Sequence, residues 1–189
     1  MFNDKAQIYT LEGAAAATIM LLVIIFTIDS TSMTPLTSST ANVHVETELQ
    51  VLGQDILNSL DYSDLGYNSD LKTDILKWNG IEHIWNGSRY QSKIGTYVLN
   101  NNITEILNAT LIGQGIAHNV EITYLNNNTL EPETLNMIYD GTPSENAIII
   151  SRKIVIQNSD NPEIYPITDI DKSTNLYNIV DVKLILWRM

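Results

Sequence analysis

The sequence is poor in two kinds of residue, cysteine and the basic side chains. None of the 189 residues is cysteine, and 10 Lys and Arg stand against 22 Asp and Glu, which gives a formal net charge of -12. Without cysteine the chain can form no disulfide, thiol nucleophile, iron–sulfur cluster or Cys-ligated zinc site. An acidic surface repels the phosphates of nucleic acids, whose binding requires clustered Lys and Arg. The composition therefore excludes cysteine chemistry and a nucleic-acid partner.

Sequence motifs of catalysis and cofactor binding are also missing. There is no H-E-x-x-H, G-x-S-x-G, P-loop or G-x-G-x-x-G pattern, and His44, His83 and His118 fall in three different segments. His118 begins a predicted strand, where packing or a capping hydrogen bond is the ordinary role. An enzyme would need a cleft that brings together acids such as those of residues 61–70. The sequence therefore predicts no enzymatic activity and no cofactor.

One long apolar run lies in the N-terminal part. Residues 13–28 (GAAAATIMLLVIIFTI) carry no charge between Glu12 and Asp29. As a helix they would span about 24 Å, against about 30 Å for the core of a bilayer, and the weakly polar residues 30–36 could extend them. A buried core helix, a cleavable secretory signal and a retained membrane anchor are all consistent with such a run. The retained anchor is favoured because of the residues after the run.

An apolar stripe continues beyond the run. Five apolar residues recur at spacings of four, three, four and four: Val45, Leu49, Leu52, Ile56 and Leu60. This spacing is typical of an amphipathic helix. A cleaved signal has no reason to run into such a stripe. We therefore expect one helix from about residue 10 to about residue 60, bent near Pro35 because proline removes one helical hydrogen bond.

The rest of the chain has the pattern of an α+β head. Helical spacing occurs in residues 70–78 and 96–111, and strand patterns occur in residues 116–125, 134–139, 146–157 and 178–187. The Asn-rich residues 126–128 are typical of a hairpin connection, and the polar residues 151–153 indicate an irregularity or an exposed stretch. Short links between four strands favour an antiparallel sheet, one face of which can cover the apolar stripe.

These patterns together predict an α+β protein whose long N-terminal transmembrane and amphipathic helix packs on a small antiparallel β-sheet head. The expected segments are a membrane helix that reaches to about residue 36, an amphipathic extension at 37–60 and the head at 61–189. This arrangement implies a single-pass protein of the cell membrane, in contact with membrane lipid.

The residues before the apolar run carry a recognisable pattern. Lys5-Ala6-Gln7-Ile8-Tyr9-Thr10-Leu11-Glu12, followed by the run, resembles the start of archaeal type IV pilin-like proteins with a class III signal. In that family a prepilin peptidase cuts before a Gln that follows a basic and a small residue. The resemblance implies processing at Lys5, Ala6 and Gln7, with the cut between Ala6 and Gln7. It also implies that residues 1–6 are a leader and that the helix at 7–36 is retained, in the membrane or in the core of an extracellular filament. The N-terminus would then be cytoplasmic before processing and the head extracytoplasmic.

Glu12 departs from the family pattern by one position. The usual glutamate is the fifth mature residue, whereas a cut before Gln7 makes Glu12 the sixth. A carboxylate there can pair with the terminal ammonium of a neighbouring subunit, which would otherwise be buried unpaired. Alternatively, Glu12 lies at the lipid headgroups, favoured by the helix dipole. The offset rotates the acid by about 100° around the helix, and both interpretations stay open.

Four further segments resemble an uncharacterised archaeal pilin-like family with the same N-terminal anchor. They are residues 120–124, 140–147, 151–156 and 176–188. This resemblance covers most of the chain but brings no known activity. It implies a surface-exposed, membrane-anchored structural protein, a minor pilin or filament-associated subunit, with other pilin-like subunits and a prepilin peptidase as partners. The alternative is an anchored extracellular binding module that does not polymerise.

Four sequons fit a position outside the cell. Asn86, Asn102, Asn108 and Asn127 each begin an N-x-S/T sequence. Chance matches are common in a chain this rich in Asn. A glycan on Asn127, at the predicted hairpin tip, is easiest to accommodate, and Asn108 on a predicted helix is the poorer candidate.

One loop has oxygen donors at alternate positions. Asp169, Asp171, Ser173 and Asn175 resemble the start of an EF-hand, but Thr174 replaces the turn glycine and no acid closes the loop. These four residues are weak metal candidates. A solvated loop before the last strand is the ordinary interpretation.

Two tryptophans lie close to a histidine in the sequence. Trp78, His83 and Trp85 could form an aromatic surface for a saccharide, but buried Trp anchors are commoner. Both interpretations depend on whether the rings are exposed.

Overall fold

The computed structural model describes residues 16–21, 40–160, 162 and 166–188. The chain divides into two compact units, Met1–Asn42 and Val43–Met189. In the first unit, residues 16–21 are helical and exposed. The predicted leader, the processing residues Lys5, Ala6 and Gln7, Glu12, and most of the apolar run lie outside the described residues. The sheet and its packed helices belong to the second unit.

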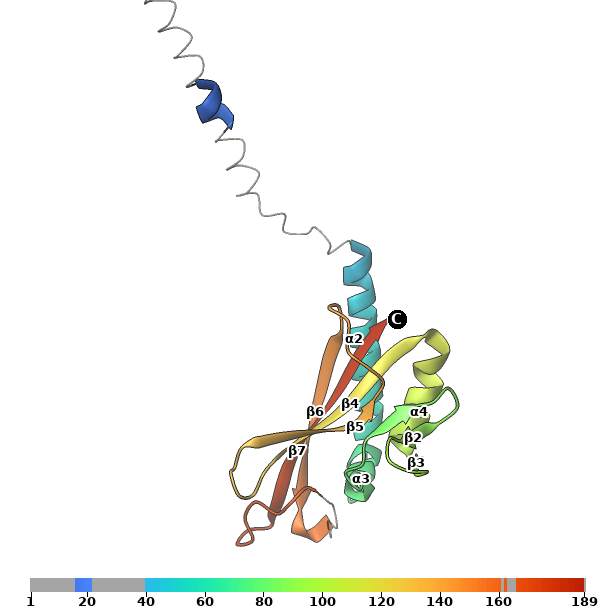
Figure 1. Cartoon of the computed structure of the whole chain (residues 1–189). Helices are drawn as coiled ribbons and strands as arrows, with labels where there is room; N and C mark the ends of the chain where they lie inside the picture. The colour runs from blue at the N-terminus through green and yellow to red at the C-terminus, as the bar shows by residue number, and fades with distance from the viewer. Residues whose placement is uncertain (1–15, 22–39, 161, 163–165, 189) are drawn as a thin grey trace, which may run out of the picture. The chain divides into compact units, whose positions relative to one another are not determined.

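The second unit contains both helices and strands, which are shown in Figure 1. The helices are α2 (Thr40–Asp61), α3 (Asp70–Lys77) and α4 (Asn102–Thr110), with short 3-10 turns η1 (Ile112–Gln114) and η2 (Asn158–Asp160). The strands are β1 (His83–Trp85), β2 (Tyr90–Ser92), β3 (Val98–Leu99), β4 (Ile116–Leu125), β5 (Pro132–Tyr139), β6 (Ile148–Gln157) and β7 (Leu176–Arg188).

The described strands form one seven-stranded sheet in the order β3-β2-β1-β5-β4-β7-β6. Neighbouring strands are antiparallel except β1 and β5, which pair in parallel through His83 and Ile138. The prediction of a small antiparallel sheet is therefore wrong, because the sheet is mixed and nearly twice as wide as expected. The four strands β4 to β7 were predicted. The strands β1 to β3 have only two or three residues, too few for an alternating pattern to be visible.

The last strand, β7, shows why the sheet has one strongly apolar face. Val180, Val182 and Leu184 are buried, whereas Asp181 and Lys183 point to the other face and are partly exposed. This matches the two-residue period of a strand. Since β7 lies between β4 and β6, its apolar face is at the centre of the core.

Strand β6 runs unbroken through its polar residues 151–153, for which the sequence indicated an irregularity or an exposed stretch. The second interpretation holds, because Ser151 and Lys153 are exposed. Arg152 donates a hydrogen bond to Asn58 on α2, and Lys153 lies 3.6 Å from Asp181 on β7. The register shift is at the far end of the strand, between Ile156 and Gln157. Polar partners on both faces therefore keep these residues in the strand.

Helix α2 packs closely on the apolar face of the sheet, as Figure 1 shows. Leu49, Ile56 and Leu60 of the predicted stripe are buried, and Val45 and Leu52 pack against the same core from its margin. Gly53 lies at the point of closest approach. A Cβ atom there would be 2.5 Å from Cδ1 of Ile150 on β6. The absence of a side chain at Gly53 therefore allows the helix to approach the sheet.

The predicted membrane anchor is contradicted. Among the described residues, no helix is both long and apolar enough to cross a bilayer. The longest, α2, has 22 residues and carries four carboxylates, Glu46, Glu48, Asp55 and Asp61. Its length serves packing on the sheet. The long transmembrane N-terminal helix, the single-pass topology and the predicted location in a cell membrane are therefore corrected.

Helix α4 is shorter than the predicted helix 96–111. Asn101 caps it by accepting a hydrogen bond from the backbone N–H of Thr104, whose hydroxyl accepts one from the N–H of Asn101. This reciprocal capping box begins the helix at Asn102. Val98 and Leu99, which fitted the helical spacing, form β3 instead. Pairing with β2 thus overrides a local pattern.

Candidate functional site

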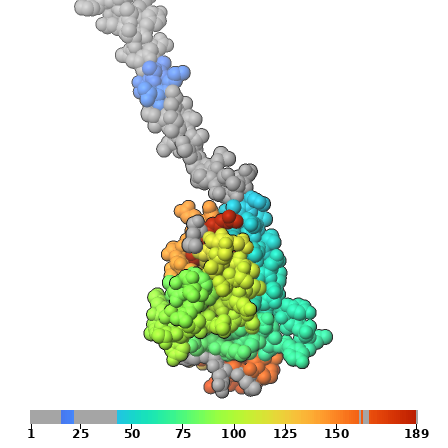
Figure 2. Space-filling model, turned by 90° about the vertical axis from the view of Figure 1, so that its right-hand side faces the viewer, coloured from blue at the N-terminus to red at the C-terminus, as the bar shows by residue number. Residues whose placement is uncertain are grey.

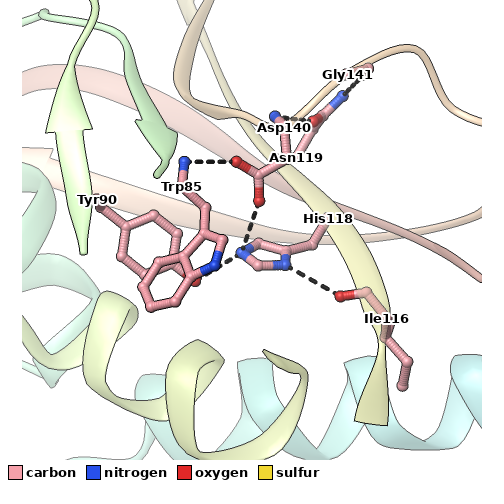
Figure 3. Close-up of polar contacts among 7 residues, drawn as sticks. All are labelled: Trp85, Tyr90, Ile116, His118, Asn119, Asp140 and Gly141. Atoms are coloured by element: carbon pink, nitrogen blue, oxygen red, sulfur yellow. Dashed lines mark hydrogen bonds and ion pairs between the residues drawn. The ribbon is translucent and has the colours of Figure 1, made fainter. Parts of the chain in front are cut away.

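A buried polar cluster joins three parts of the sheet. Tyr90 on β2, His118 on β4 and Asp140 after β5 meet around one imidazole nitrogen (Figure 3). The Tyr90 hydroxyl lies 2.8 Å from Nε2 of His118, and Oδ2 of Asp140 lies 3.5 Å from the same nitrogen. Nδ1 of His118 lies 3.5 Å from the Ile116 carbonyl. His118 is fully buried, and Tyr90 nearly so.

Asp140, which follows β5, is held by residues of two other strands, β1 and β4. Its Oδ1 accepts a hydrogen bond from the backbone N–H of Trp85 at 2.8 Å, which ties β1 to the end of β5. The side chain of Asn119 accepts from the Asp140 N–H and donates to the Gly141 carbonyl (Figure 3). Gly141 has φ +139°, a conformation that favours glycine. These contacts fix the Asp140 carboxylate beside the imidazole.

Burial controls the ionisation of this cluster. It lowers the pKa of His118, and the nearby Asp140 carboxylate only partly opposes that shift. Burial also raises the pKa of Tyr90, and Asp140 adds to the effect by repelling a phenolate. At neutral pH the imidazole is therefore neutral and the phenol protonated, and one hydrogen bond joins the Tyr90 hydroxyl to Nε2. Such a cluster acts as a fixed hydrogen-bonded network.

Two surface cavities share Trp85. The larger, about 540 Å³, is lined by Trp85, Arg89, Tyr90, Asn100, Glu105 and Asn108, among others. The smaller, about 320 Å³, is mainly apolar and is lined by Trp85, Ile112, Ile116, Ala117 and Asp140, among others. The rings of Trp85 and Tyr90 pack at a tilt with centroids 5.0 Å apart. The buried cluster therefore supports Trp85, which is half-buried and lies between two cavities of different polarity.

The predicted aromatic surface of Trp78, His83 and Trp85 does not form as such. Trp78 is buried, and its indole donates to the Ile81 carbonyl at 2.9 Å. His83 is also buried, which lowers its pKa, and its Nδ1 has no hydrogen-bond partner among the described residues. Trp78 is thus a core anchor, the commoner role of a buried Trp. Trp78 and His83 line a separate cavity of about 230 Å³, and Trp85 is the partly exposed member of the three.

A buried acid that the sequence did not single out joins two helices. Asp74 on α3 accepts hydrogen bonds from the Ile103 N–H at 2.8 Å and from the Asn102 side chain at 3.3 Å. Burial raises its pKa, and the hydrogen bond from Ile103 opposes the shift. In the sequence, only its position between the apolar Leu71 and Ile75 indicated that Asp74 could be buried. Asp74 therefore fixes the start of α4 against α3.

The four sequons lie in different environments. Asn127 in the β4–β5 connection and Asn108 on α4 are exposed. The Asn86 amide donates to Gln91 at 2.9 Å, and the half-buried Asn102 amide donates to Asp74. Asn108 and Asn127 thus have the more accessible amides. Glycosylation itself stays a prediction.

The weak metal candidates form hydrogen bonds within local turns. Oδ1 of Asp169 accepts from the Asp171 N–H, and Oδ1 of Asp171 accepts from the N–H and hydroxyl of Ser173. The hydroxyl of Ser173 and then its N–H lower the pKa of Asp171. In the part of the chain that the structure describes, no group of three His, Asp or Glu side chains could hold a metal ion. The backbone carbonyl of Asn175 accepts a hydrogen bond from the Asn158 N–H.

Comparisons with known proteins place the chain in a family. Residues 5–186 match the model of a family of unknown function, DUF7288. An uncharacterised protein of Archaeoglobus fulgidus is 32% identical over 186 residues, which cover 97% of this chain and 92% of that protein. No solved structure matches the chain. The matched residues 5–186 include α2 and nearly all of the sheet, and the chain belongs to the DUF7288 family.

Proposed function

We propose that the chain is a pilin-like structural subunit, which assembles with copies of itself or with other pilin-like subunits. The observation that carries the proposal is the packing of the amphipathic helix α2 on one face of the sheet, with Gly53 against Ile150. The resemblance of residues 5–12 to the N-terminus of pilin-like proteins implies a long helix that packs on the head in this way. Its prepilin peptidase would be a processing partner.

The solvent side of α2 supports an assembly role. Val43 and Val51 are exposed by 49% and 52%, on a helix whose other face is fully used by the core. Apolar side chains on an exposed helix face can pack against a second subunit, because their burial is favourable by about 25 cal/mol per Å². Similarity to the archaeal relative over almost the whole chain is consistent with one conserved architecture.

The N-terminus of the native protein tests the proposal. Mass spectrometry of the chain from its own organism should find Gln7 as the first residue. Replacing Lys5→Ala should leave the chain unprocessed, whereas Lys172→Ala, at an exposed site far along the sequence, should not affect processing. A native chain that starts at Met1 would contradict the proposal.

A binding module that does not polymerise is the second candidate. The cavity of about 540 Å³ beside Trp85 favours it, because its size is that of a small-molecule site. The two candidates differ in assembly. A chain that stays monomeric in its native state, with or without processing, favours the second.

A further inference from the structure

All residues that line the larger cavity lie between Trp85 and Asn108, in the part of the chain that runs from β1 through β3 to α4. Trp85 ends β1, Arg89 lies in the β1–β2 turn, Asn100 follows β3, and Glu105 and Asn108 lie on α4. Figure 2 shows this face, on which the green β1–β3 segment lies against the yellow-green α4. The volume of about 540 Å³ is within the range of about 300–1,000 Å³ that is usual for small-molecule sites.

Two opposite charges line this cavity without neutralising each other. Arg89 and Glu105 are exposed, and within the described residues neither side chain forms an ion pair or a hydrogen bond. Arg188 and Glu48, by contrast, pair with each other at 3.0 Å elsewhere on the surface. The cavity therefore offers a planar donor and a carboxylate acceptor that are both free, together with the amides of Asn100 and Asn108.

The aromatic wall of the cavity is rigid. The backbone N–H of Trp85 donates to Asp140, and the indole packs on Tyr90, which is itself bonded to the buried His118. A wall that is already ordered lowers the entropic cost of binding, because the aromatic ring does not have to be immobilised by the ligand. The buried cluster thus gives the exposed part of Trp85 a fixed position.

We infer that this cavity binds a neutral saccharide. Sugar hydroxyls both donate and accept, so one ring can bond Arg89, Glu105 and the amides at once. Its apolar C–H face can lie on the indole of Trp85. Glu105 disfavours an anionic ligand and Arg89 a cationic one, which leaves a neutral polar molecule. This inference does not depend on whether the chain assembles into a filament.

The saccharide has two conceivable sources. It can belong to another molecule, or it can be a glycan on Asn108, which is exposed and lines the cavity. Chain produced without glycosylation leaves the cavity open to an added sugar. Native chain that carries a glycan on Asn108 should not bind added sugar, whereas its Asn108→Gln variant should. Native chain without that glycan should bind added sugar as the unglycosylated chain does.

The test is a titration of the full, unglycosylated chain with the methyl glycosides of glucose, mannose, galactose and N-acetylglucosamine at millimolar concentrations. The signal is tryptophan fluorescence, because Trp85 is more exposed than the buried Trp78 and Trp187. We expect at least one sugar to bind in a saturable way. Arg89→Gln and Glu105→Gln should each weaken it about tenfold, since each removes a hydrogen bond to a charged group.

Matched variants keep the test decisive. Lys172→Gln and Glu145→Gln change exposed charges away from the cavity and should leave the affinity unchanged. Circular dichroism of every variant checks that the fold is retained. Absence of binding for all four sugars would overturn the inference. So would equal weakening by the control variants, or tighter binding of glycine and dipeptides, because a zwitterion also matches one free cation and one free anion.

Discussion

Gly53 offers a sharp test of how closely α2 lies on the sheet. A Cβ atom at this position would be 2.5 Å from Cδ1 of Ile150 and 3.1 Å from Cδ1 of Leu186. Ordinary carbon contacts are about 3.5–4.0 Å, so the methyl group of Gly53→Ala would overlap Ile150 by about 1 Å. Either Ile150 must leave its rotamer or the helix must move away from the sheet.

Two effects of opposite sign decide the result of Gly53→Ala. Alanine stabilises a helix interior by about 1 kcal/mol relative to glycine. Overpacking of a core costs about 1–3 kcal/mol. The free energy of unfolding should therefore fall by about 0–2 kcal/mol in the wild-type background, measured by urea denaturation followed by circular dichroism.

In a second background, Ile150→Val, the effect of Gly53→Ala on the free energy of unfolding should change sign. Ile150→Val removes the Cδ1 atom that lies closest to Gly53, so the methyl group gains room. In that background Gly53→Ala should raise the free energy of unfolding by about 0.5–1 kcal/mol, since the helix propensity remains and most of the overlap is gone. An equal effect of Gly53→Ala in both backgrounds, or a stabilisation in the wild type, would refute the close packing.

Two further predictions concern the buried histidines. Tyr90→Phe should lower the free energy of unfolding by about 1–2 kcal/mol, because it removes the hydroxyl bonded to Nε2 of His118, whereas Tyr97→Phe, at a ring exposed by 66%, should change it by less than about 0.5 kcal/mol in the same denaturation assay. The domain should also lose stability as the pH falls below about 6.5, since His83 and His118 have lowered pKa values in the folded state and the unfolded chain binds their protons first. Denaturation midpoints that do not fall between pH 7 and pH 5 would contradict this sign, and His44→Gln, at an exposed site, should leave the pH profile unchanged.

The long elements of the fold could be predicted because their patterns are long. Strands β4 and β7 have ten and 13 residues, long enough for their strand patterns to be visible in the sequence. The apolar stripe of α2 was visible for the same reason. By contrast, β1 has three residues, and its parallel pairing with β5 depends on a contact between His83 and Ile138 that no local pattern contains.

The candidate site could not be predicted because it is assembled from distant segments. Tyr90, His118 and Asp140 come from β2, β4 and the loop after β5, and each is unremarkable in its own segment. The sequence drew attention to Trp78 and His83, which are buried beside a cavity of about 230 Å³, whereas Trp85 is partly exposed beside the larger one. Which rings are exposed is decided by strand pairing, not by spacing along the chain.

The expectation of a membrane anchor rested on joining the apolar run to the stripe of α2. The stripe is buried against the sheet, as expected for the amphipathic extension, and α2 carries acids on its other faces. The anchor is overturned because no helix among the described residues is long and apolar enough to cross a bilayer. The resemblance to pilin-like proteins, which rests on residues 5–12, the run and four segments of the head, is a separate argument. It stays a proposal about assembly.

Recovery of the chain in filaments tests that proposal most directly. Filaments should be sheared from the native organism, purified on a density gradient, analysed by mass spectrometry and imaged by electron microscopy. The proposal predicts that peptides of this chain are enriched in the filament fraction and that they begin at Gln7. Absence of the chain from every filament fraction, while it is abundant elsewhere in the same cells, would contradict it.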